Sequence, residues 1–492
     1  MALAPLNPET RNLIDGNLVP ASNGATFENV NPATEEVLGA CSDGTKDDMH
    51  TAIGAARRAF DESPWSTDAA FRKRCLTQLA EALKGAKEEL RSIVVAEAGS
   101  PVLLTYAVQC DTYIDAMPYW AELAGSYAYE QPMRDISFMG QPQRRLLRRE
   151  ATGVVGAITP WNFPVYLNLC KLGPALAAGN TVVLKPAPDT PWSATTLGRI
   201  IAERTDIPSG VVNVVASSDH GLGEMLSTDP RVDLVTFTGS TATGRRVMEC
   251  ASATVKKVFL ELGGKSATIM LDDVPLEKVL AGIGFICTHA GQGCAITTRL
   301  LLPRSRYDEG VAIAKTSFEK LAYGDPTNPA HLMGPVVSRR QHERVLAYIE
   351  MGKREGARLV TGGGVPKHLT KGFYVAPTLF ADVDPDATIA QEEIFGPVLC
   401  VIPFDDDDDA VRIANHSIYG LSGAVTSASE ERALAVARRI RTGTLSVNGA
   451  MWFDVDTPFG GYRQSGVGRE NGLLGFEEYL ETKVIALPVQ KG

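Results

Sequence analysis

Short runs of aliphatic and β-branched residues alternate with helical stretches from Gly153 onward, and this rhythm limits the possible folds more than any other feature. The apolar runs cover residues 153–159, 181–186, 210–215, 232–239 and 255–262, with helical spacing at residues 192–203. Strands that are separated by helices of this length usually pair in parallel. The sequence therefore predicts an α/β fold with a Rossmann-like, nucleotide-binding sheet.

A second set of short apolar runs begins after Gly264 and predicts a second α/β domain. Residues 51–84, with a break at Pro64, and residues 87–95 have helical spacing, so the N-terminal segment is expected to be mainly helical. Two further strand-like stretches, 136–149 and 482–487, suit neither domain and indicate a small β appendage. The predicted division is a discontinuous dinucleotide-binding domain (1–130 and 151–261), a catalytic domain (262–475) and appendage strands (131–150 and 476–492).

Charge and cysteine usage exclude several classes of function. The chain has 492 residues and a net charge of −10, which disfavours a nucleic-acid partner. Its eight cysteines form no CxxC pair, so neither a zinc site nor a disulfide framework is expected. No signal peptide and no apolar run of about 20 residues is apparent, which predicts a cytoplasmic protein without a membrane partner. The acidic run 405–409 predicts a helix N-terminus.

One glycine-rich loop is placed where a nucleotide could bind. Residues 239–244, with Gly239, Ser240 and Gly244, follow an apolar run and open a helix. Such a turn offers backbone N–H groups to a pyrophosphate, although similar turns also occur for purely structural reasons. Residues 264–266 resemble the end of a P-loop, but Phe259 occupies the upstream glycine position, so that motif fails.

Cys294 is the strongest candidate for a nucleophile. It lies in the sequence Gly-Gln-Gly-Cys (291–294), and small neighbours allow a substrate and a cofactor to approach the thiol closely. A lone cysteine is more often buried and inert, as the other seven are expected to be.

Two polar residues follow predicted strands directly. Glu261 ends an apolar run, and partial burial would raise its pKa and make it a usable general base. Asn162 lies in a loop stiffened by two prolines, where a fixed amide can donate to an oxyanion. The simpler interpretations are a capping glutamate and a turn asparagine.

Taken together, these motifs resemble the aldehyde dehydrogenase superfamily over nearly the whole chain. The segments that carry the resemblance are residues 31–34, 159–164, 171–175, 184–186, 237–241, 261–266, 291–294, 392–398 and 458–461. The resemblance implies oxidation of an aldehyde to a carboxylic acid with NAD, or possible use of NADP. It makes Cys294 the nucleophile, Asn162 the oxyanion amide and Glu261 the base that activates water for thioester hydrolysis. Because an ordinary thiol is mostly protonated at pH 7, the site is expected to depress the pKa of Cys294.

The resemblance also implies the cofactor contacts. Lys185 would hydrogen-bond the adenosine ribose, Ser240 would meet the pyrophosphate and Glu393 the nicotinamide ribose. The implied wall of the cofactor site contains Thr159, Trp161, Asn162, Pro188, Gly239, Gly244, Leu262, Gly263 and Phe395. Many NAD-preferring relatives carry a glutamate where this chain has Pro188. Since no further Arg or Lys stands nearby in sequence, we expect NAD to be preferred over NADP by a modest factor.

By the same resemblance, the substrate wall is apolar and aromatic: Leu167, Cys170, Met451, Phe453 and Phe459. This lining predicts a medium-sized, uncharged aldehyde. Two alternatives remain: a CoA-acylating semialdehyde dehydrogenase, which often lacks the glutamate at Glu261, and a catalytically silent relative. The stretches 136–149 and 482–487 look like the family's oligomerisation strands, so a homodimer or homotetramer is expected.

Overall fold

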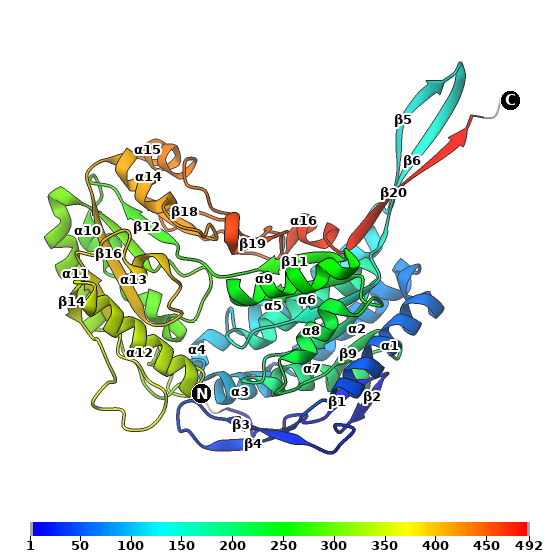
Figure 1. Ribbon diagram of the computed structural model, residues 1–492, viewed down its shortest axis with the longest axis horizontal. Helices are drawn as coiled ribbons and strands as arrows, with labels where there is room; N and C mark the ends of the chain where they lie inside the picture. The colour runs from blue at the N-terminus through cyan, green and yellow to red at the C-terminus, as the bar shows by residue number, and fades with distance from the viewer. Residues whose placement is uncertain (1–2, 490–492) are drawn as a thin grey trace.

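Two β-sheets form the two lobes of the molecule, and a three-stranded arm projects from the first lobe (Figure 1). The computed structural model describes residues 3–489. The α/β fold class expected from the alternation of apolar runs and helices is confirmed.

The first lobe contains an eight-stranded sheet whose five central strands are parallel. Strand β7 lies between β10 and β8, so the chain runs outward from β7 in both directions. Ligands of such sheets bind beyond the carboxyl ends of the strands, where the direction changes. In spatial order the strands are β19 (Gly466–Val467), β11 (Lys257–Glu261), β10 (Leu234–Thr238), β7 (Val154–Ile158), β8 (Thr181–Lys185), β9 (Val212–Val214), β1 (Asn12–Ile14) and β2 (Asn17–Val19).

Both faces of this sheet are covered by helices because both faces of its strands are apolar. Val154, Val183 and Val235 pack toward α1 (Lys46–Glu62), α8 (Gly221–Thr228) and α9 (Thr241–Ala251). Val155 and Val182 pack toward the opposite helices. These are α2 (Ala69–Gly85), α3 (Lys87–Ala98), α5 (Asp111–Ser126), α6 (Pro164–Ala178) and α7 (Pro191–Arg204).

The second lobe contains a seven-stranded sheet with its own apolar core. Its strands, in spatial order, are β14 (Arg358–Thr361), β15 (Thr378–Ala381), β16 (Val398–Phe404), β13 (Arg299–Pro303), β12 (Ala267–Met270), β17 (Gly423–Thr426) and β18 (Ser446–Val447). Its helices are α10 (Leu276–Leu280), α11 (Tyr307–Glu319), α12 (Arg339–Arg354), α13 (Thr388–Gln391), α14 (Asp407–Asn415) and α15 (Glu430–Ala437).

The arm consists of β5 (Glu130–Phe138), β6 (Gln141–Ala151) and β20 (Leu480–Pro488), all antiparallel. The stretch 136–149 spans the end of β5, a turn with positive φ at Met139 and Gly140, and most of β6. It is therefore part of a hairpin rather than one strand, because the turn offers a reversal that the apolar pattern alone does not reveal.

The remaining elements fill the edges of the first lobe. They are the hairpin β3 (Thr26–Val30) and β4 (Val37–Ser42), the short helix α4 (Val102–Thr105) and α16 (Gly472–Glu477). Strand β19 pairs with β11, so the chain re-enters the first sheet at Gly466. The sequence division assigned residues 262–475 to the catalytic domain, because a two-residue strand such as β19 leaves no readable pattern.

Candidate active site

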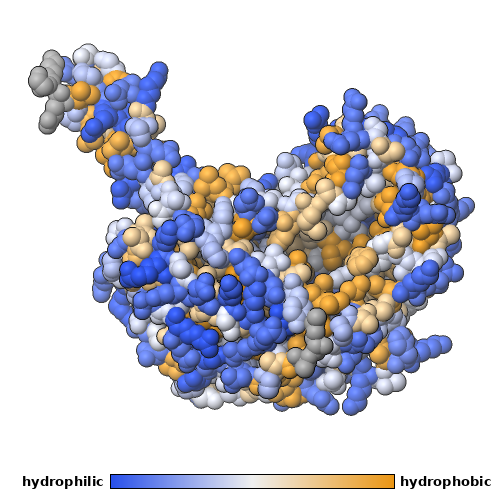
Figure 2. Space-filling view, turned by 180° about the vertical axis from the view of Figure 1, so that it is seen from behind, coloured by the Kyte–Doolittle hydropathy of each residue, from blue (hydrophilic) through white to orange (hydrophobic). Residues whose placement is uncertain are grey.

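A cavity of about 1280 Å³ opens between the two lobes at the carboxyl ends of β7, β8, β10 and β11. Figure 2 shows apolar side chains around the hollow between the lobes. Asn162, Glu261 and Cys294 all line this cavity. The three predicted catalytic residues are thus brought together from β7, β11 and the second lobe.

Cys294 follows a strained turn of the backbone. His289, Ala290 and Gly291 all have positive φ, at 52°, 54° and 69°. A Cβ on Gly291 would lie 2.2 Å from the carbonyl oxygen of Gly396, and one on Gly264 would lie 2.9 Å from that of Cys294. The glycines around the thiol are therefore required by close backbone approach.

The surroundings of Cys294 raise the pKa of its thiol. Burial is the main cause, and the carboxyl groups of Glu261, Glu393 and Glu470 add to it. The expectation that the site depresses this pKa is wrong, because both burial and nearby negative charge oppose thiolate formation.

Asn162 is held by contacts on both its main chain and its side chain. Its carbonyl oxygen accepts from Gln109 Nε2 at 3.0 Å and contacts His289 Nε2 at 2.7 Å. Its amide Nδ2 donates to the Gln292 carbonyl at 2.9 Å. Burial lowers the pKa of His289 to about 4, so this ring is neutral at pH 7. The amide is thus fixed in the wall, with a second N–H still available to an oxyanion.

Glu261 ends β11 in a buried position. Among residues 3–489, neither of its carboxyl oxygens has a hydrogen-bond partner. Burial and the nearby Glu470 raise its pKa well above the ordinary value, while Lys171 and Arg469 oppose that shift. The raised pKa makes this carboxylate a stronger proton acceptor than an exposed glutamate.

An ion pair lies beside this base. Lys171 on α6 bonds Glu470, and both side chains are buried. Sequence reasoning quoted Lys171 only as part of a motif and missed Glu470. No pattern around Glu470 signals its role, because the isolated bridge between Glu470 and Phe459 brings it to the cavity from far along the chain.

The cofactor side of the cavity contains most of the residues predicted for it. Ser240 caps α9 and accepts from Thr243 N at 3.3 Å. Trp161 and Phe395 meet edge to face with centroids 5.4 Å apart. Thr159, Trp161, Asn162, Lys185, Pro188, Gly239, Ser240, Leu262, Gly263, Glu393 and Phe395 all line the cavity.

Glu393 reaches this wall only because Gly263 has no side chain. Gly264 N donates to Glu393 Oε1 at 2.9 Å, and a Cβ on Gly263 would lie 2.2 Å from Oε2. Burial raises the pKa of Glu393 to about 7. Its carboxyl group is therefore available to a ribose hydroxyl at this point of the wall.

Gly244 is a correction to the predicted cofactor wall. It does not line the cavity, and a Cβ there would lie 2.6 Å from Leu262 Cδ2. Its small size lets α9 pack against the end of β11. It acts in packing rather than at the cofactor surface.

Cys170 is a second correction, on the substrate side. It is fully buried behind the wall, with Sγ 3.3 Å from Glu470 Oε2 and 3.4 Å from Asn471 Oδ1. A small polar side chain at this place turns into the protein instead of facing the substrate. The predicted wall residues Leu167, Met451, Phe453 and Phe459 do line the cavity, with Val108, Tyr166, Ile296 and Trp452, which were missed.

The comparisons with known proteins agree with this geometry. The model of the aldehyde dehydrogenase family matches residues 18–485. The chain belongs to this family. Across the matched range it is an oxidoreductase of the aldehyde dehydrogenase type, with relatives of the same kind in sequence and in structure.

Two sequence relatives cover almost the entire chain. The 3-succinoylsemialdehyde-pyridine dehydrogenase of a Pseudomonas species is 42% identical over 476 residues, 96% of this chain and 97% of its own. The mitochondrial aldehyde dehydrogenase of Leishmania tarentolae is 41% identical over 475 residues, 96% of this chain and 94% of its own.

Solved structures are equally similar. Betaine aldehyde dehydrogenase of Staphylococcus aureus in complex with NAD+ has a TM-score of 0.94 at 34% identity, covering 98% of this chain and 95% of that one. An aldehyde dehydrogenase of Mycobacterium tuberculosis complexed with NAD+ has a TM-score of 0.94 at 41% identity, covering 99% and 100%. A Pseudomonas syringae aldehyde dehydrogenase with NAD+ and octanal has a TM-score of 0.91 at 37% identity, covering 98% of each chain.

Proposed function

We propose that this aldehyde dehydrogenase uses NAD to oxidise an uncharged, medium-sized aldehyde to its carboxylic acid through a thioester on Cys294 that water hydrolyses. The observation that carries the proposal is the meeting of a half-buried thiol, a fixed amide and an unpartnered buried carboxyl group in one cavity. The NAD complexes of similar enzymes support the choice of cofactor.

The cofactor side of the cavity fits a dinucleotide. Ser240 at the N-terminus of α9 suits a pyrophosphate, Lys185 suits the adenosine ribose and Glu393 suits the nicotinamide ribose. When bound, NAD supplies the acceptor for the hydride that leaves the substrate carbon.

The first bond forms between Cys294 Sγ and the aldehyde carbon. Cys294 is only half-buried and lines the open cavity, so its proton passes to solvent when the thiolate forms. The aldehyde oxygen then carries the negative charge, and the Asn162 amide and the backbone N–H of Cys294 donate to it. Loss of hydride from this thiohemiacetal restores the C=O bond and leaves a thioester.

Hydrolysis of the thioester needs a base beside a water molecule. Glu261 accepts the proton of the water, oxygen bonds to the acyl carbon, and the C–S bond breaks to release the acid and free Cys294. Lys171, paired with Glu470, places a positive charge near the carboxyl group and opposes the rise in its pKa. Glu261 thus favours water, rather than CoA, as the acyl acceptor.

The substrate wall supports an uncharged aldehyde. Trp452 and Phe459 stack with a 5.6 Å centroid separation, and Tyr166 and Phe453 lie 5.7 Å apart. No Arg or Lys stands among the wall residues of this side: Val108, Phe163, Tyr166, Leu167, Ile296, Met451, Trp452, Phe453 and Phe459. A carboxylate-bearing semialdehyde would lose its hydration there without a partner.

Product analysis tests the proposal. We expect NADH and the free acid from enzyme, NAD and an aldehyde panel, with ¹⁸O from labelled water in the acid and no dependence on CoA. Octanal and benzaldehyde should give a kcat/KM at least tenfold above that of succinate semialdehyde. An acyl-CoA product, or the reverse substrate order, would contradict the corresponding part of the proposal.

The arm supports assembly into a homodimer or homotetramer. Phe138, Met139 and Val484 are 65%, 87% and 55% exposed on it. Apolar side chains on a projecting sheet edge favour pairing with another copy of the chain. Light scattering at micromolar concentration should give a mass at least twice that of one chain; a monomer would contradict this.

A further inference from the structure

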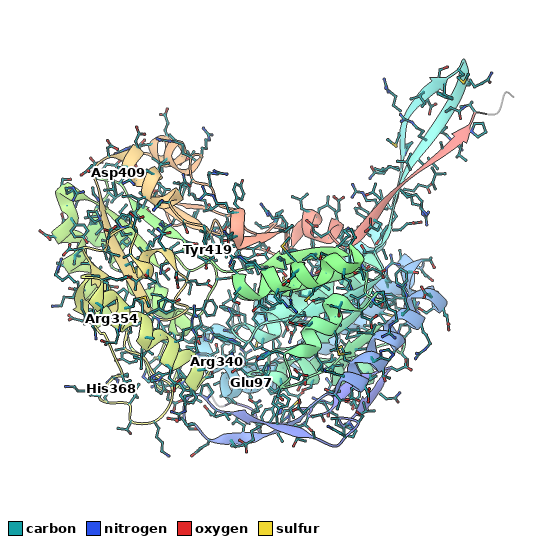
Figure 3. The ribbon with its side chains drawn as sticks, in the orientation of Figure 1. Glu97, Arg340, Arg354, His368, Asp409 and Tyr419 are labelled. Atoms are coloured by element: carbon teal, nitrogen blue, oxygen red, sulfur yellow. The ribbon has the colours of Figure 1, made fainter. Side chains whose placement is uncertain are left out.

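The adenosine end of the cavity contains a cation that the proposed cofactor contacts do not use. Lys185, Pro188, Asp189, His220 and Arg340 line the cavity together. The first four come from the first lobe, while Arg340 comes from the first turn of α12 in the second lobe (Figure 3). Arg340 therefore enters the cavity from the lobe opposite to Lys185.

The start of α12 lies near the loop that follows β8. Ser338 Oγ caps α12 by accepting from Gln341 N at 3.4 Å, and the Ser338 hydroxyl is close enough to Asp189 to oppose the rise of its pKa. Asp189 directly follows Pro188 in sequence, and Ser338 stands two residues before Arg340.

Neighbouring arginines of α12 have partners that Arg340 lacks. Arg339 pairs with Glu35 at 2.5 Å, and Arg344 donates to the Glu393 carbonyl at 2.9 Å. No side chain or carbonyl of residues 3–489 forms an ion pair or hydrogen bond with the Arg340 guanidinium, which is exposed in the cavity. Burial raises the pKa of Asp189, and the charge of Arg340 opposes that rise. Burial lowers the pKa of His220, and the charges of Lys185 and Arg340 lower it further.

We propose that Arg340 binds the 2′-phosphate of NADP and allows this enzyme to use NADP as well as NAD; this inference rests on the proposed cofactor site. A 2′-phosphate carries nearly two negative charges, and a guanidinium can bind two of its oxygens at once. Lys185, at the end of β8 in the first lobe, supplies a second cation to the same cavity.

The carboxyl groups near Lys185 have other partners. Asp43 accepts from Ser217 and Ser218, Asp219 accepts from Gly221 N, and Glu224 pairs with Arg246. Pro188 holds no charge, unlike the glutamate that many NAD-preferring relatives carry there. Burial is the main influence on Asp189 and raises its pKa, so the charged form is disfavoured. Lys185 has its pKa lowered to about 8, mainly by burial, and remains mostly protonated at pH 7. The sequence alone does not reveal that Arg340 and Lys185 line one cavity, because Arg340 lies far downstream of Lys185.

Binding of nucleotide fragments tests the inference without catalysis. We would measure dissociation constants of adenosine 2′,5′-bisphosphate and 5′-AMP by calorimetry for the wild type, Arg340→Gln and Arg339→Gln. Arg340→Gln should weaken the bisphosphate about tenfold or more, in keeping with a lost charge-assisted contact, and 5′-AMP less than twofold. Arg339→Gln, a loss of the same charge one residue away, should leave both constants unchanged.

Steady-state rates give a second readout. Arg340→Gln should raise the ratio of kcat/KM for NAD over NADP at least tenfold, and Arg340→Lys should restore part of NADP use. Equal weakening of both fragments, or no change in either, would overturn the role of Arg340 while leaving NAD oxidation intact. Failure of the wild type to bind either fragment would instead contradict the cofactor site itself.

Discussion

The two ends of the cavity are built differently. At the catalytic end, Cys294, Asn162 and Glu261 are held by buried contacts and close glycine packing, and burial shifts the pKa of both the thiol and the carboxyl group. At the adenosine end, Arg340 and His220 are exposed side chains that line the cavity from different lobes. The comparison teaches that the reaction type depends on positions that tolerate little change, whereas cofactor choice depends on surface charges that can vary.

The largest effect is expected at the thiol. Cys294→Ala should abolish NADH formation, because Cys294 is the thiol that lies with Asn162 and Glu261 in the cavity. Cys250→Ala is the matched control, since Cys250 lines the cofactor side of the same cavity. Cys250→Ala should keep most of the activity. Turnover by Cys294→Ala above the uncatalysed rate would contradict the covalent mechanism.

Loss of the oxyanion amide ranks next. Asn162→Ala should lower kcat by about 10²–10³, the usual loss for one oxyanion donor. Dissociation constants for NAD should change little. A defect confined to NAD binding would show that this loop serves only as a cofactor wall. Asn162 would then not belong to the catalytic end of the cavity.

The catalytic end is readable from the sequence because its determinants are local. Glu261 is the last residue of its strand, and the glycines in residues 291–294 predict a tight turn with a thiol at its end. The acidic run 405–409 likewise predicts a helix start, and Asp406 caps α14 by accepting from Asp409 N at 2.8 Å. Close packing after folding, such as Gly244 against Leu262, cannot be distinguished in sequence from a phosphate loop.

The residues missed by sequence reasoning are those that the fold brings from afar. Glu470 reaches Lys171, His289 reaches the Asn162 carbonyl, and Arg340 reaches the loop after β8. The inward turn of Cys170 depends on Glu470 and Asn471, which lie far from it in sequence. The raised pKa of Cys294 also follows from burial, which spacing does not report.

The raised pKa of Cys294 makes a pH prediction for the enzyme without NAD. Because the folded pKa lies above that of a free thiol, the protonated form persists at neutral pH and thiolate appears only as the pH rises. The rate of Cys294 alkylation by iodoacetamide should increase about tenfold per pH unit from pH 7 to pH 9. A plateau already reached below pH 7 would mean that the protein alone stabilises the thiolate.

The smallest effect is expected from one charge at the adenosine end. Pro188→Glu should shift the ratio of kcat/KM toward NAD by about fivefold to tenfold, since a carboxylate near a phosphate costs about 1 kcal/mol per charge in wet surroundings. The kcat with saturating NAD should be unchanged. A variant that lost both cofactors equally would point to a local distortion rather than to charge.

The most direct test of the account is to trap the acyl-enzyme. Glu261→Gln should bind NAD, release one burst of NADH per active site with an aldehyde, and then stall. Mass spectrometry of the stalled enzyme should show the acyl group on Cys294 and on no other cysteine. Full steady-state turnover of Glu261→Gln, with no adduct on Cys294, would contradict the claim that Glu261 activates water to hydrolyse a thioester.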